Sequence, residues 1–187
     1  MTTRMNRDQS GQALVEVSFG LIMLCVFVLG IIDCGRAVYD VEVMKNLVGE
    51  GSSMASRSGG TDLSTIVGSI TTDAGNDLNI GTSGCIIVTS VQNMGSGSIQ
   101  VTNQAWGGGI SGTASCKSKI GCVSGTSGCS NSNATLPAAA VSALTTEGTG
   151  SSIAVTEIYY NYSTITPLPR FLGSNALPSQ FYAVAYY

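Results

Sequence analysis

The sequence predicts an α+β protein in which a long N-terminal membrane-spanning helix precedes a small exported domain with an antiparallel sheet. Three observations predict this arrangement. Residues 17–32 form an apolar run that no charge interrupts, apolar residues at helical spacing continue to about Arg57, and alternating segments typical of strands follow. We therefore divide the chain into a cytoplasmic leader at 1–11, a transmembrane and amphipathic helix at 12–57, and an exported α+β domain at 58–187.

The apolar run is long enough to cross a bilayer. Counted from Gln12 to the end of the run, the stretch holds one charge, Glu16, and a spanning helix needs about 20 residues. Arg4 and Arg7 precede the run, and the positive-inside rule then keeps the N-terminus in the cytoplasm and sends the rest outward. The sequence thus predicts a single pass, with lipid contacting residues 17–32. A removable secretory signal is the alternative, although no small-residue cleavage site directly follows the run.

Beyond the run, the pattern predicts that the same helix continues with one apolar side. Apolar residues recur at helical spacing, at Ala37, Val41, Met44 and Val48. Such a stripe can pack against a small globular domain. The alternative is two helices, broken near Gly30 or Gly35.

Glu16 is an anomaly in this segment, because a carboxylate at the centre of a membrane helix costs roughly 2.5–3.5 kcal/mol, and less near its end. An intramembrane charge therefore suggests a functional partner. If the peptide bond after Gly11 is cut, Gln12 gains a free amine, with which Glu16 of the same or a neighbouring subunit can pair. The helix dipole also favours a carboxylate near the helix N-terminus. The alternative is a Glu16 side chain that snorkels to the interface.

The exported part shows both helical and strand periodicity. The patterns predict helices over 63–77 and 137–144, and strands over 85–91, 98–103, 153–162 and 180–187. The Gly/Ser/Cys-rich residues 107–133 predict a long surface loop, with disorder as the alternative if its thiols are free.

Four of the six cysteines lie in the exported part, at Cys85, Cys116, Cys122 and Cys129. In an exported domain they predict two disulfides, for which three connectivities are possible. Reduced, separate thiols are the alternative. A zinc site fits less well, because the spacing lacks the close pairs of zinc knuckles.

The composition argues against several classes of function. Charged residues make up 10% of the chain, against about 25% in ordinary soluble domains. The net charge of -3 favours no nucleic-acid partner, because no basic patch can neutralise phosphates. Histidine is absent and the acidic residues are scattered, so most acid–base catalysis near neutral pH would need substitutes. We therefore expect no enzyme, no cofactor and no metal site.

Two stretches resemble a known family. The first stretch is Gly11-Gln12-Ala13-Leu14-Val15-Glu16, and the second, after the apolar run, is Gly30-Ile31-Ile32-Asp33-Cys34-Gly35-Arg36-Ala37. They are similar to the TadE-like minor pilins or pseudopilins of tight-adherence (Flp pilus) systems. Val17 and Cys34 stand where the family usually has aromatic residues. The resemblance is good over residues 4–57 and moderate over 153–187, where a strand, a Thr-Pro loop and a terminal strand follow one another.

The resemblance implies a pilin-like fold and a structural role. It implies cleavage between Gly11 and Gln12 by an aspartic prepilin peptidase, with Glu16 as the acidic residue of the motif. The implied partners are this peptidase, other pilin-like subunits and the inner-membrane assembly platform. The implied location is the bacterial inner membrane, with the C-terminal domain outside the cytoplasm, or an extracellular pilus.

The sequence therefore favours a pilin-like subunit that helps to assemble a type IV or Flp pilus or a tight-adherence secretion apparatus. The alternative is an uncleaved single-pass anchor that displays an adhesive or binding domain. Loss of residues 1–11 from the membrane-extracted protein distinguishes the first from the second.

Overall fold

The structure is a computed structural model that describes residues 6–121, 132–166 and 178–187. The chain divides into two compact units, Met1–Val38 with Ser163–Leu177, and Tyr39–Tyr162 with Pro178–Tyr187. Each unit is described by itself.

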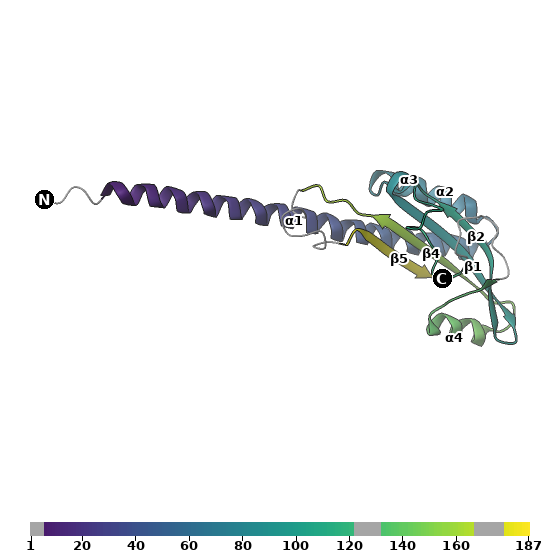
Figure 1. Ribbon diagram of the computed structural model, residues 1–187. Coiled ribbons are helices and arrows are strands. Elements are labelled where there is room, and N and C mark those ends of the chain that lie inside the picture. The colour runs from purple at the N-terminus through teal and green to yellow at the C-terminus, as the bar shows by residue number, and fades with distance from the viewer. Residues whose placement is uncertain (1–5, 122–131, 167–177) are drawn as a thin grey trace. The chain divides into compact units, whose positions relative to one another are not determined.

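A single helix, α1, runs over Asn6–Arg57 (Figure 1). It continues through Gly30 and Gly35 without a break, so the alternative of two helices is wrong. The segment contains no proline, and its many Leu, Met, Ala and Val residues tolerate helical geometry. The helix also begins earlier than the predicted residue 12.

The remaining elements are short helices and an antiparallel sheet. The helical elements are α2 (Leu63–Asp73), the 3-10 turn η1 (Ala74–Asn76), α3 (Ile80–Ser83) and α4 (Ala138–Glu147). The strands are β1 (Gly84–Gly95), β2 (Ser98–Gly107), β3 (Ser132–Asn133), β4 (Ser152–Asn161) and β5 (Gln180–Tyr186). All the predicted helices and strands are present, and β1 and β2 extend by four residues beyond the predicted ends at 91 and 103.

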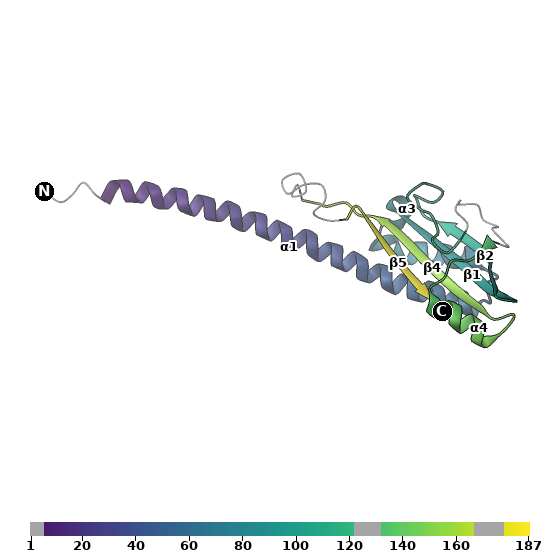
Figure 2. The same cartoon turned by 60° about the horizontal axis from the view of Figure 1, so that its bottom comes forward.

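The sheet has the order β3-β2-β1-β4-β5, with every pair antiparallel. Figures 1 and 2 show the four long strands of this sheet, β2, β1, β4 and β5. β1 and β2 form a hairpin whose tip, Gly95-Ser96-Gly97, has positive φ angles throughout. Such angles favour glycine and explain the Gly-rich turn. β5 is the last strand in the chain but pairs beside β4, as Tyr159↔Tyr182 shows.

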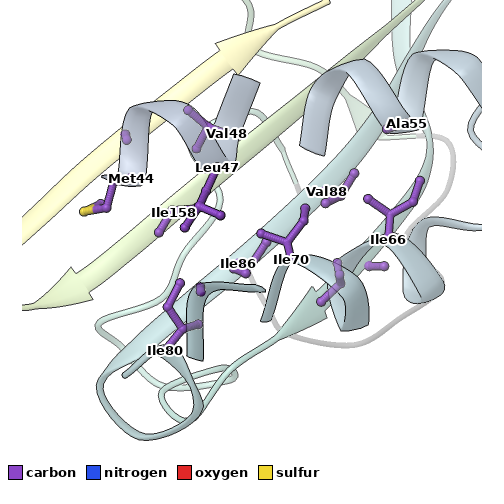
Figure 3. Packing of buried hydrophobic residues seen from close by; sticks show 14 of the residues in the cluster. Met44, Leu47, Val48, Ala55, Ile66, Ile70, Ile80, Ile86, Val88 and Ile158 are labelled. Carbon is purple, nitrogen blue, oxygen red and sulfur yellow. The ribbon is translucent and has the colours of Figure 1, made fainter. Parts of the chain in front are cut away.

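One face of the sheet packs against helices within the second unit. Met44, Leu47 and Val48 of α1 lie with Ile66 and Ile70 of α2. Figure 3 shows these side chains directed toward the sheet residues Ile86, Val88 and Ile158. Each fully buried aliphatic side chain contributes about 1.5–3 kcal/mol, so this cluster is the main core of the unit.

The opposite face of the sheet is covered by α4 and by part of the predicted loop. Ile120 and Leu144 pack there against Val91, Val101 and Val155. Residues 108–121 of the predicted loop have no strand or helix, whereas Ser132–Asn133 form β3. The second unit therefore has three layers, with the sheet in the middle.

Candidate membrane and assembly site

The predicted cleavage position lies inside α1. Gly11 and Gln12 are exposed and helical, and a side chain added at Gly11 would meet no atom within 4 Å. Nothing in the described chain covers this peptide bond.

Glu16 follows Gln12 by four residues on the same helix, so both side chains lie on one face of α1. Glu16 is exposed and makes no hydrogen bond or ion pair within the described ranges. The carboxylate is thus placed beside the residue whose amine the predicted cleavage would create. The partner itself stays a prediction.

The hydrophobic side chains of the apolar run are exposed. Phe19 and Phe27 are each 68% exposed, and Ile31 is 72% exposed. In the described chain, α1 is the one helix long and apolar enough to cross a membrane, with a mean hydropathy of 2.6 in its most apolar window. No residue of that window is buried. Exposed apolar surface of this extent indicates contact with lipid or with other protein.

Asp33 directly follows the apolar run and is 3% exposed. Its carboxylate accepts hydrogen bonds from the backbone N–H groups of Ile165 and Thr166, at 3.3 and 3.4 Å, and from the Thr166 hydroxyl. In the sequence, Asp33 was identified only as part of the family-like stretch that follows the apolar run. The contact joins residues more than 130 positions apart, and no local pattern marks such a pair.

A second buried carboxylate, Glu157, lies on the sheet face opposite α1. It accepts hydrogen bonds from the Ser118 hydroxyl, the Lys119 backbone N–H and the Tyr182 hydroxyl. Burial, and then the charge of Glu157, raise the pKa of the Tyr182 phenol. This phenol therefore stays protonated and donates to the carboxylate. Sequence reasoning identified Glu157 only as a strand residue.

The segment that carries Ser118 is attached to the sheet at further points. Tyr159 donates its hydroxyl proton to the Lys117 carbonyl at 2.6 Å, and Gln104 donates to the Gly121 carbonyl at 3.2 Å. The Lys119 ammonium lies 3.6 Å from the centre of the Tyr182 ring, a cation–π contact. These contacts fix residues 117–121 over the sheet.

Cys85 and Cys116 form a disulfide with a Cα–Cα distance of 6.0 Å. The pairing fixes the start of the same segment to β1. Cys122 and Cys129, the other two predicted disulfide residues, lie outside the described residues. Cys25 and Cys34 are exposed free thiols on α1. Over residues 6–121, 132–166 and 178–187, no three His, Cys, Asp or Glu side chains form a group that could hold a metal ion.

In the comparison with protein families, the family model described as "TadE-like protein" matches residues 11–53. The match includes Gly11, Gln12, Glu16 and Asp33. Comparisons with curated proteins and with solved structures gave no match. The resemblance is therefore confirmed over 11–53, and the long apolar helix with its antiparallel sheet is an α+β arrangement of the pilin-like kind.

Proposed function

We propose, from the TadE-like family domain at residues 11–53, that this chain is a minor pilin or pseudopilin cut by a prepilin peptidase between Gly11 and Gln12. The family domain implies a pilin-like, structural protein associated with the Tad pilus. The specific proposal is that the cut chain joins a type IV or Flp pilus, or a tight-adherence secretion apparatus. The observation that carries it is Glu16, exposed on an apolar helix four residues after Gln12.

The apolar run supports insertion in the bacterial inner membrane. Arg4 and Arg7 hold the leader on the cytoplasmic side, and residues 58–187 are then outside the cytoplasm. The exposed side chains over 17–32 contact lipid before assembly. After assembly they pack against the same helix of neighbouring pilin-like subunits, supported by the inner-membrane platform.

Cleavage then changes the electrostatics of the helix end. The cut removes Arg4 and Arg7, which set the orientation, and creates an amine on Gln12. A carboxylate and an amine that meet between subunits in a weakly polar surrounding attract strongly, whereas either charge alone is costly there. Glu16 therefore favours the assembled state over the separate subunit.

The experiment is an intact-mass and N-terminal analysis of the membrane-extracted chain, from cells with and without a prepilin peptidase. We expect residues 1–11 to be lost only when the peptidase is present. Gly11→Val should block the cut, because the peptidase must approach the bond closely and glycine permits this.

Gly20→Val is the matched control, because a side chain at either glycine meets no atom within 4 Å and both lie in α1. The control should be cut normally. An intact Met1 in cells that contain the peptidase would contradict the proposal and favour an uncleaved single-pass anchor that displays an adhesive or binding domain.

A further inference from the structure

The proposed function does not use the buried carboxylate of Asp33. The residue directly after the apolar run is 3% exposed, although the two residues before it, Ile31 and Ile32, are 72% and 47% exposed. Asp33 is therefore buried by something other than its own helix. Ile165 and Thr166, in the segment that follows β4, donate hydrogen bonds to it.

The contact with Asp33 fixes the backbone of residues 165–166, because two of its donors are main-chain N–H groups. A carboxylate that accepts from N–H groups forms charge-assisted hydrogen bonds, which are stronger than those between neutral groups. The Thr166 hydroxyl adds a third donor to the same carboxylate. Residues 165–166 are thus held beside α1 at the level of Asp33, where the apolar run ends.

Ile165 combines a backbone bond to a buried carboxylate with an exposed aliphatic side chain. Its N–H lies 3.3 Å from the Asp33 carboxylate, yet the residue is 68% exposed. Its side chain therefore adds an exposed aliphatic surface beside the residue that directly follows the apolar run. If α1 spans the membrane up to this point, this surface lies at the boundary between lipid and water.

We propose that Asp33 and residues 163–166 form a membrane latch, which holds Ile165 in contact with the outer surface of the lipid bilayer. The inference rests on the proposed function, since it needs the apolar run to be inserted. The chain then touches lipid at a second point besides the spanning helix. Side chains anchored at the interface set the tilt and rotation of a membrane helix, so the latch fixes how α1 presents its faces to neighbouring subunits.

The test places a tryptophan at Ile165 in the full chain, reconstituted in phosphatidylethanolamine–phosphatidylglycerol vesicles whose acyl chains carry bromine. Brominated lipid quenches tryptophan that it touches. The parent chain, in which Trp106 is the single tryptophan, gives the baseline. We expect Ile165→Trp to add a component that emits at shorter wavelength and is quenched by the brominated lipid.

Variants of the latch test the role of Asp33. In the Ile165→Trp chain, Asp33→Ala should abolish the added quenching, and Thr166→Val should reduce it because it removes one donor. Glu42→Ala is the matched control on α1, since Glu42 is exposed, and it should leave the quenching unchanged. Quenching that survives Asp33→Ala would overturn the role of Asp33.

A tryptophan inside the apolar run separates this inference from the proposed function. If Phe27→Trp is not quenched, the helix is not inserted and the proposed function fails. If Phe27→Trp is quenched and Ile165→Trp is not, the latch proposal is overturned while the proposed function stands. Shielding of Ile165→Trp from acrylamide in that case would show that protein covers it instead of lipid.

Discussion

At the scale of single residues, Glu16 and Glu157 are carboxylates in opposite environments. Glu157 is fully buried and is satisfied by two hydroxyls and a backbone N–H of its own chain. Glu16 is exposed on an apolar helix and makes no such contact in the described chain. Glu157 therefore completes its bonds on folding, whereas the proposed partner of Glu16 arises only through cleavage and assembly.

Glu16→Gln should leave cleavage intact and impair assembly. The substitution keeps size and hydrogen bonding but removes the charge that attracts the Gln12 amine. We expect the amount of the subunit in the sheared surface fraction, or in cross-linked multimers, to fall by about tenfold or more, the equivalent of about 1.4 kcal/mol. Glu42→Gln, on an exposed part of the same helix, is the control. Normal assembly of the Glu16 variant would remove the proposed role of its charge.

At the scale of elements, α1 changes its surroundings along its length. Its N-terminal part exposes the apolar run, and residues 44–55 contribute Met44, Leu47, Val48 and Ala55 to the core of the second unit. A Cβ added at Gly51 would lie 2.5 Å from the Ile70 side chain and 3.1 Å from that of Thr156. Glycine is therefore what allows α1 to approach α2 and β4 closely here.

Gly51→Leu and Gly49→Leu form a matched pair two residues apart. A side chain at Gly49 meets no atom within 4 Å, so its substitution should gain up to about 1 kcal/mol of helix propensity. The same change at Gly51 forces apart a packed core and should lower the free energy of unfolding by about 1–3 kcal/mol. Urea unfolding of the full chain in detergent, followed by circular dichroism, measures both. Equal stability of the two variants would contradict the close packing at Gly51.

At the scale of the whole molecule, the chain meets two kinds of surroundings. The exposed apolar run needs lipid or other protein, whereas the second unit buries its apolar residues on both faces of the sheet. The second unit is also stabilised by the Cys85–Cys116 disulfide, which closes a span of 31 residues. Disulfides persist in oxidising compartments, and an exported location is consistent with this bond.

Replacing Cys85 and Cys116 together by serine should lower the free energy of unfolding by roughly 3–4 kcal/mol, because the unfolded chain regains the entropy of an open loop. Chemical unfolding under non-reducing conditions measures the loss. The control is Cys25→Ser with Cys34→Ser, since both are exposed free thiols on α1, and it should leave the stability of the second unit unchanged. A double serine variant as stable as the parent would show that the bond contributes little.

The sequence by itself determined the features that depend on neighbouring residues. The length and apolar character of residues 17–32 predicted the long helix, and the alternation in 153–162 and 180–187 predicted strands, because helix and strand periodicities are local properties. Gly11, Gln12 and Glu16 were also identified from their order in the chain. Only the tertiary structure joined Asp33 to Thr166, Glu157 to Ser118 and Cys85 to Cys116. These contacts connect residues 31 to 133 positions apart. Which distant residues meet depends on how the whole chain packs, and local patterns in one sequence do not contain that information.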